Sequence, residues 1–238
     1  MAFIDGIKRR LHRDIVADPV LHGLVLNLYL NGEAYPHRVE DYFPIAAVDE
    51  PELAAAMSAH AKDEDKHVAL YARAIEKMGQ SVLDLPMDDI FNEVIRKRTS
   101  ASFAMSETDT RDGRRRKLAH FLAHAHFLEK RVARSLDYHI EACAHSATPY
   151  AEKAVGAVLS DEARHVDYTR EAVLDLLPRT EALEVLALHE RAETLANLDF
   201  SISQLSKLLR EHSRRFPVGS RWIHRGCVAL MRRWVAYA

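Results

Sequence analysis

Apolar residues recur at every third or fourth position over five long stretches of the chain, which places them on one face of an α-helix. Proline or glycine bounds several stretches, such as Pro51 at a start and Gly79 after a stop. The pattern predicts long helices over residues 18–43, 51–78, 114–147, 148–177 and 180–212. The first is expected to kink at Pro36. A short helix is expected over Asp89–Lys97.

The links between these helices indicate how they are arranged. Short links join the first helix to the second and the third to the fourth, so each pair is expected to form an antiparallel hairpin. A crossover of about 35 residues joins the hairpins. The fold class predicted is all-α: a four-helix bundle with one long crossover and additional C-terminal helices. We expect one globular domain with an N-terminal basic amphipathic segment (1–17), the bundle (18–178), an additional helix (179–212) and an Arg-rich tail (213–238).

Each helix of the expected bundle has a carboxylate within its apolar stripe, and two of them add a histidine one turn later. Burying one unpaired carboxylate costs several kcal/mol, so four need compensation. Two divalent cations would balance four carboxylates, and Glu and His at positions i and i+3 project together from a helix. The candidate metal ligands are Glu33, Glu64, His67, Glu129, Glu162 and His165.

Two five-residue segments share one motif, Asp-Glu-x-(Lys/Arg)-His. Asp63–His67 reads DEDKH and Asp161–His165 reads DEARH. Glu33 precedes the first motif and Glu129 precedes the second at a similar distance, so the two halves of the chain repeat. The motifs are interpreted as the two halves of one dinuclear metal site. The alternative is a buried ion-pair network without metal.

These motifs resemble the ferritin-like di-iron carboxylate superfamily over roughly residues 18–178. The closest resemblance is to oxygen-activating members with paired motifs, such as bacterial multicomponent monooxygenase hydroxylases and acyl-carrier-protein desaturases. The resemblance implies that Glu64 and Glu162 bridge the metals and are the catalytic residues. It also implies that Asp63 orients His165, that Asp161 orients His67, and that the charges of Lys66 and Arg164 neutralise the two aspartates. Lys66 departs from the more usual arginine.

The resemblance implies an oxygen-dependent non-haem di-iron oxidase or oxygenase that acts on a small organic substrate. Two iron ions are expected, one held mainly by Glu33, Glu64 and His67 and the other mainly by Glu129, Glu162 and His165. Manganese is the alternative metal. Electrons are expected from an external, ferredoxin-like donor, because the chain has no flavin fingerprint and no iron–sulfur cysteines. The alternatives are a ferroxidase or iron-handling protein, a peroxide-removing rubrerythrin- or manganese-catalase-like enzyme, and a non-enzymatic binding module.

Composition narrows the expected partners and the compartment. The net charge of -2 argues against nucleic-acid binding. Two cysteines, Cys143 and Cys227, form no disulfide framework, and the start of the chain does not read as a secretory signal, so we expect a cytoplasmic protein. The Arg-rich tail has six arginines and no acid. It and segment 1–17 are each interpreted either as a packed helix or as a basic surface for a membrane or an acidic partner. A homodimer across bundle faces is a further expectation.

Several polar residues near the candidate ligands have two interpretations. Glu40 is interpreted as a surface residue, with an additional metal carboxylate as the alternative. His124 and His126 are expected to support Glu129 or to lie at the surface, with a metal-binding role as the alternative. Three tyrosines near the ligand turns are expected to pack in the core, with a radical or proton-relay role as the alternative. They are Tyr29, Tyr71 and Tyr168.

Overall fold

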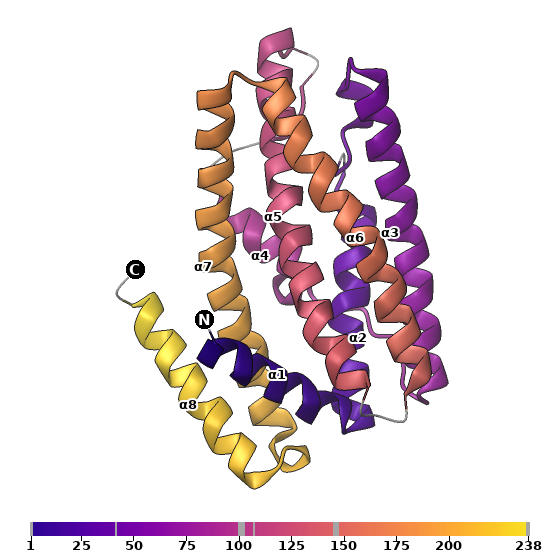
Figure 1. Cartoon of the computed structure of the whole chain (residues 1–238), viewed down its shortest axis with the longest axis vertical. Coiled ribbons are helices and arrows are strands. Elements are labelled where there is room, and N and C mark those ends of the chain that lie inside the picture. The colour runs from indigo at the N-terminus through magenta and orange to yellow at the C-terminus, as the bar shows by residue number, and fades with distance from the viewer. Residues whose placement is uncertain (1, 41, 100–102, 107, 145–147, 237–238) are drawn as a thin grey trace.

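A computed structural model describes residues 2–40, 42–99, 103–106, 108–144 and 148–236, with side chains from residue 5 onward. The all-α class is confirmed: within these ranges the chain forms α-helices and short 3₁₀ turns, and no strand (Figure 1). The last two residues of the expected Arg-rich tail lie outside the described part. The helices are α1 (Ala2–Val16), α2 (Pro19–Glu33), α3 (Pro51–Lys77), α4 (Phe91–Arg98), α5 (Arg111–Cys143), α6 (Pro149–Leu176), α7 (Arg179–Glu211) and α8 (Val218–Val235).

Local sequence signals explain most of the helix ends. The carboxylate of Asp18 accepts hydrogen bonds from the N–H groups of Val20 and Leu21, and so caps the start of α2. Gly79 takes a φ of 70°, a conformation that favours glycine, two residues after the end of α3. Thr110 caps α5, which therefore begins at Arg111, slightly before the expected start.

The first long helix is shorter than predicted. It ends at Glu33 and does not continue through a kink at Pro36 to Phe43. A 3₁₀ turn (Tyr35–Arg38) follows, because proline cannot supply the N–H of a continuing α-helix and its ring disfavours helical backbone in the preceding residue. The Tyr35 side chain is buried in this turn, and its hydroxyl donates a 2.7 Å hydrogen bond to Glu93 Oε2. The turn thus fixes the chain just beyond Glu33.

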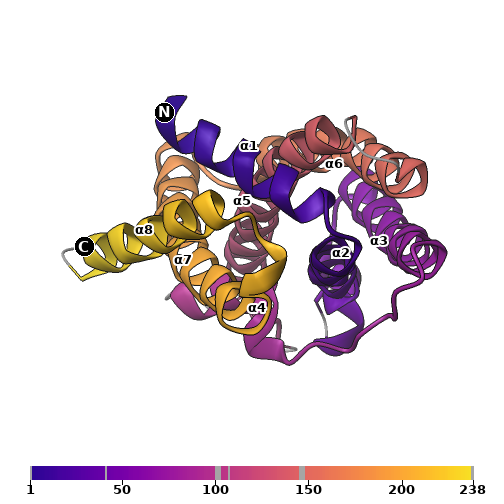
Figure 2. The same cartoon turned by 90° about the horizontal axis from the view of Figure 1, so that it is seen from below.

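Helices α2, α3, α5 and α6 run beside one another and share an interior (Figures 1 and 2). Two apolar clusters fill it at different heights. One cluster combines Met57 of α3 with Phe121 of α5 and Val173 of α6. The other includes Leu26 of α2, Ile75 of α3, Leu136 of α5 and Val158 of α6. The predicted metal ligands lie between these two clusters along the sequence of each of α3, α5 and α6.

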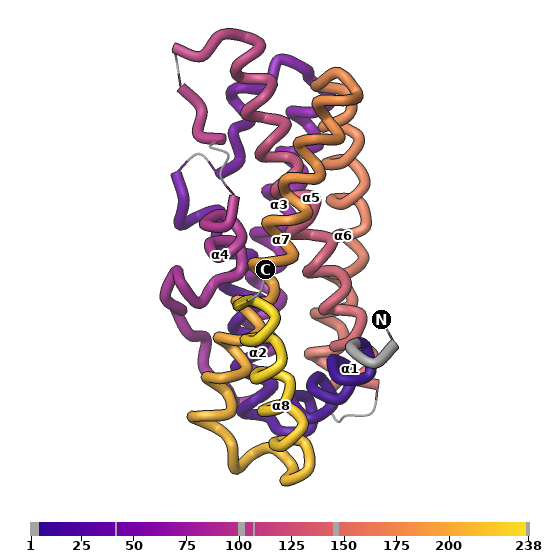
Figure 3. Tube along the Cα trace, turned by 90° about the vertical axis from the view of Figure 1, so that its left-hand side faces the viewer, coloured from indigo at the N-terminus to yellow at the C-terminus, as the bar shows by residue number. Residues whose placement is uncertain are grey.

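The remaining helices cover the outside of this core. Helix α7 packs against α4 and α5, and α8 folds back along the lower part of α7, close to α1 (Figure 3). Ile15 of α1, Leu208 of α7 and Val228 of α8 belong to one buried cluster, so each terminal helix has a packed face. The other face of α8 exposes Trp222 and Trp234. In the described ranges, no helix has both the length and the apolar character needed to cross a membrane.

Candidate metal centre

Helices α2, α3, α5 and α6 bring the six predicted ligands into one buried region, and none of the six is more than 7% exposed. Five of the six, together with His60, form two groups whose ligand atoms lie within 4.8 Å of one another: Glu33, His67 and Glu162 in the first, and His60, Glu64 and His165 in the second. The sixth ligand, Glu129, adjoins the second group, since its Oε1 lies 3.6 Å from His60 Nε2.

The two motif histidines are oriented in the same way. His67 directs Nδ1 toward Glu33 Oε2 at 3.2 Å, and its Nε2 lies 3.1 Å from Asp161 Oδ2. His165 directs Nδ1 toward Glu162 Oε2 at 3.4 Å, and its Nε2 lies 3.4 Å from Asp63 Oδ2. With the Nε2 proton donated to the aspartate, each imidazole could give up any proton on Nδ1 and offer that lone pair to a cation among the interior carboxylates. Each motif therefore supplies the aspartate that orients the histidine of the other motif.

Two basic side chains at the surface form ion pairs with both aspartates. Lys66 Nζ lies 2.6 Å from Asp161 Oδ2 and 3.8 Å from Asp63 Oδ1. Arg164 contacts the same two aspartates, at 2.5 Å and 3.3 Å. Although burial alone would raise the pKa of Asp161, hydrogen bonds from Lys66 and His67 lower it below its usual range. Asp161 thus stays ionised, which keeps it an acceptor for the His67 imidazole N–H group.

Burial and mutual repulsion act strongly on the central carboxyl groups. Burial, reinforced by the charges of Glu33 and Glu129, raises the pKa of Glu64 well above its usual value. Burial and the same two neighbours also raise the pKa of Glu162. Burial opposes ionisation of Glu129 too, but its contact with His60 prevails and lowers its pKa to about 2. Without cations, these glutamates cannot all remain charged.

Three buried side-chain atoms at the centre, each able to bind a metal ion, have no hydrogen-bond partner within the described ranges. They are both side-chain oxygens of Glu162 and Nδ1 of His165. Buried polar groups are normally paired, and each unpaired one costs about 1–3 kcal/mol. These atoms converge with other carboxylates and an imidazole, so a bound cation is the partner that would satisfy them. The donors fit a divalent metal with oxygen and nitrogen ligands.

No protein-family model, curated protein or solved structure matches the chain.

Each of the two groups combines candidate ligands from both sequence halves. Glu162 of the second half lies with Glu33 and His67 of the first, and Glu64 of the first half lies with His165 of the second. Glu64 and Glu162 are therefore the carboxylates shared between halves.

His60 is a member of the site that the sequence pattern did not single out. Its Nε2 lies 3.0 Å from Glu64 Oε1, its Nδ1 lies 2.8 Å from the Tyr168 hydroxyl, and its ring stacks on His165 with centroids 3.7 Å apart. A signal was present, because His60, Glu64 and His67 have the i, i+4, i+7 spacing of one helical face. Burial, followed by the charge of the adjacent His60, lowers the pKa of His165 to about 4.

The structure places several of the polar residues for which the sequence left two interpretations. Glu40 is exposed, and His126 Nδ1 lies 3.0 Å from the carbonyl oxygen of Val166. His124 is buried against the ring of Phe103, 5.3 Å between centroids. The Tyr71 hydroxyl is buried and finds no hydrogen-bond partner within the described ranges. None of the first three therefore belongs to the two ligand groups.

Proposed function

We propose that the protein is a non-haem di-iron oxidoreductase, an oxygen-dependent oxidase or oxygenase of a small organic substrate, with a ferritin-like four-helix bundle. One observation carries the proposal: buried carboxylates from four helices surround two imidazoles whose outer nitrogens are fixed by aspartates from opposite halves. Four glutamates balance two divalent ions. Oxygen and imidazole donors without cysteine suit iron or manganese better than a closed zinc site.

The chain's own residues have distinct tasks in this proposal. Glu33 and His67 would hold one ion, Glu129 and His165 would hold the other, and Glu64 and Glu162 would be ligands common to both. Asp161 and Asp63 keep the imidazoles in the tautomer that leaves Nδ1 available. When bound, the two irons supply the electrons that reduce oxygen. The apolar layers on either side of the centre exclude water from it.

Electrons for repeated turnover come from outside the chain, and we propose an acidic, ferredoxin-like protein as their donor. The exposed face of α8 offers a complementary surface: Trp222 is 70% exposed, and the Arg225 guanidinium lies over its ring. Replacing Arg225 and Arg233 by glutamate should slow reduction of the oxidised protein by such a donor and leave reduction by dithionite unchanged. Equal rates for the variant and the native chain with both reductants would exclude this docking surface.

The function is tested by anaerobic titration with Fe(II), followed by exposure to oxygen. We expect saturation near two irons per chain, rapid oxidation of both, and a visible absorption band that forms and decays. Oxidation of many irons per chain would contradict the proposal and favour a ferroxidase. Selective Mn(II) binding with disproportionation of peroxide and no need for a reductant would instead favour a catalase-like enzyme.

A matched pair of variants assigns the iron to this site. The double substitution Glu64→Ala, Glu162→Ala removes both shared carboxylates and should abolish stoichiometric Fe(II) binding. Glu40→Ala removes an exposed glutamate close to the end of α2 and should retain two irons per chain. Iron binding that persists in the double variant would show that the metal lies elsewhere.

A further inference from the structure

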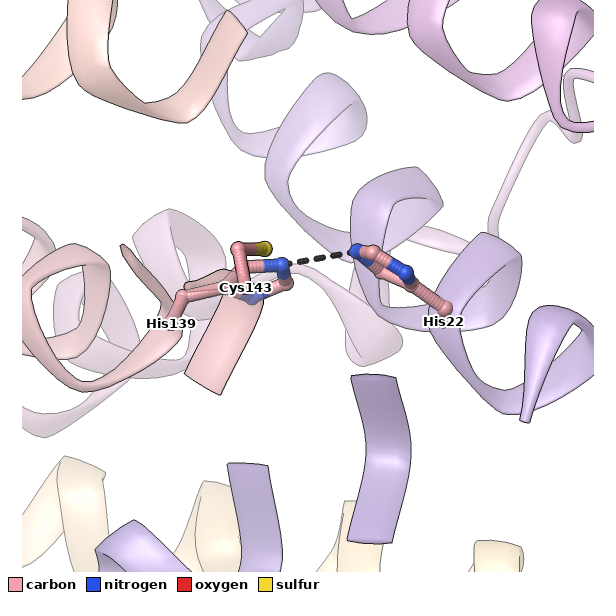
Figure 4. A group of neighbouring side chains, drawn as sticks. All are labelled: His22, His139 and Cys143. Carbon is pink, nitrogen blue, oxygen red and sulfur yellow. Dashed lines mark hydrogen bonds between the residues drawn. The ribbon is translucent and has the colours of Figure 1, made fainter. Parts of the chain in front are cut away.

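A second group of metal-ligating side chains lies at the junction of α2 with the C-terminal end of α5, apart from the proposed di-iron centre. The ligand atoms of His22, His139 and Cys143 lie within 4.8 Å of one another (Figure 4). All three side chains are at most 1% exposed. His139 and Cys143 are four residues apart on α5, so they project from the same face of that helix. His22 faces them from α2.

The hydrogen bonds of the two imidazoles leave nitrogen lone pairs within this group. His22 Nε2 and His139 Nε2 are 2.9 Å apart, so one donates a proton and the other accepts it. His139 Nδ1 lies 3.3 Å from the Tyr29 hydroxyl. A proton on His139 Nδ1 can therefore be donated to Tyr29, which leaves Nε2 available to a metal. His22 Nδ1 is buried and has no hydrogen-bond partner in the described ranges, so one nitrogen of this ring is left unpaired.

The group is buried among uncharged side chains, and burial favours its neutral forms. Val16 of α1 packs with Cys143, and the His12 ring of α1 lies 5.7 Å from the His139 ring. Burial lowers the pKa of His22 to about 4. Burial, followed by the charge of the exposed Glu152, raises the pKa of the Cys143 thiol to about 12. Neutral imidazoles and a thiol are the ligands present before a metal binds.

We propose that His22, His139 and Cys143 form a binding site for one Cu(I) ion. Thiolate and imidazole are soft to intermediate donors, which suit monovalent copper. As the ion enters, Cys143 loses its thiol proton to solvent, the His22 proton moves by exchange with solvent from Nε2 to Nδ1, and the sulfur–copper and nitrogen–copper bonds form, with no change in oxidation state. The thiolate then cancels the charge of Cu(I), whereas Zn(II) with the same ligands would leave one uncompensated positive charge in an apolar interior.

Entry of the ion requires a small local rearrangement. With metal–nitrogen bonds of about 2.0 Å, a trigonal ion holds two nitrogens roughly 3.5 Å apart, further than in the hydrogen-bonded imidazole pair. Rotation of the His22 ring away from His139 supplies this separation and breaks their mutual hydrogen bond. Val16 of α1 packs against Cys143, so we expect this end of α1 to shift when the ion enters.

The test is a Cu(I) titration of the reduced, metal-free, full-length protein under anaerobic conditions, in competition with bicinchoninate. We expect one Cu(I) per chain, and X-ray absorption of the loaded protein should show one sulfur and two nitrogen neighbours. Cys143→Ser should weaken binding by more than the roughly 10–100-fold expected for loss of a group that merely supports a ligand. Cys227→Ser, a change at the partly exposed cysteine of α8, should leave the affinity unchanged.

Further measurements make the result independent of the di-iron proposal. The Glu64→Ala, Glu162→Ala variant should still bind one Cu(I) with native affinity. His22→Gln should bind more weakly while its far-UV circular dichroism and iron stoichiometry match those of the native chain. Copper without a sulfur neighbour in the native protein, copper that is lost with the glutamates, or preferential retention of one Zn(II) would each overturn the assignment. The X-ray absorption result needs no variant and therefore decides even if Cys143→Ser fails to fold.

Discussion

The proposed di-iron centre and the proposed copper site both contain buried histidines, but they differ in the number of acidic side chains among their ligands. Four glutamates belong to the proposed di-iron centre, whereas imidazoles and a thiol make up the proposed copper site. Both sites are withdrawn from water, where an unbalanced charge is costly. The number of ionisable anions in each site therefore sets the total cation charge that it can hold: four for the glutamate site, and one for the cysteine site. Because both sites are buried, the number of anionic ligands in each determines which cation charge it binds best.

The two sites also differ in how firmly their imidazoles are held. At the di-iron centre, His67 is fixed on one side by Asp161 and on the other by Glu33. At the copper site, His22 is held through its Nε2 contact with His139. Tyr29 and Tyr71 lie between the two sites: Tyr29 contacts His139, and the two tyrosine rings are 5.7 Å apart. We therefore expect metal binding to rearrange the copper site more than the di-iron centre.

The largest expected effect concerns the metal-free protein: the two sites should change its free energy of unfolding in opposite directions as pH changes. The unfolded chain protonates His22 near its ordinary pKa of 6.5, whereas the folded chain does so only near 4. The unfolded state therefore takes up protons first, and stability is lost as pH falls from about 6.5 to about 4, by on the order of 3 kcal/mol. Glu162 acts in the other direction: its folded pKa exceeds the ordinary 4.5, so stability is lost as pH rises above that value.

Urea unfolding of metal-free variants between pH 4 and pH 8 measures these contributions. His22→Gln should lose less stability on acidification than the native chain. Glu162→Gln should lose less on raising the pH. His37→Gln replaces an exposed histidine and should follow the native curve. Identical pH profiles for His22→Gln and Glu162→Gln would contradict the contrast between the sites.

An intermediate effect is expected where an aspartate orients a ligand histidine. Asp161→Asn keeps the size of the side chain but removes the charge that favours a proton on His67 Nε2. We expect Fe(II) affinity to fall about 10–100-fold, with Cu(I) affinity unchanged. Asp65→Asn, in the same motif as Asp63 but on the exposed side of α3, is the control and should bind both metals normally. A loss of Cu(I) binding in Asp161→Asn would show that the two sites are coupled.

The sequence predicted the glutamate site better than the cysteine site, for a geometric reason. Glu64 and His67 lie one turn apart, and the same pair recurs at Glu162 and His165, so helical periodicity and repetition reveal them together. The copper ligands give no such signal, because His22 and His139 are separated by 117 residues and meet only through helix packing. A single cysteine without a neighbouring cysteine also matches no metal-binding motif.

The same limit explains the errors in the fold. The starts and ends of α3, α6 and α7 follow from proline, glycine and apolar spacing, and the structure places them within one or two residues of the predicted positions. The end of α2 at Glu33 depends on how Tyr35 docks against Glu93, a contact between distant segments. His60 belongs to neither Asp-Glu-x-(Lys/Arg)-His motif, so repetition does not reveal it, and its place beside Glu64 depends on packing. Local pattern predicts helices, and packing selects which polar side chains face inward.

The smallest effect is expected at Lys66, at the surface end of the di-iron centre. Its side chain is 51% exposed, and Arg164 contacts the same Asp161 carboxylate. Exposed ion pairs contribute about 0–1 kcal/mol, and the arginine remains when the lysine is removed. Lys66→Met should therefore lower the free energy of unfolding by less than about 1 kcal/mol and weaken Fe(II) binding by less than about 10-fold. Arg164→Met is the reciprocal measurement. If Lys66→Met weakens Fe(II) binding as much as Asp161→Asn does, Lys66 is needed to keep Asp161 ionised and Arg164 cannot replace it.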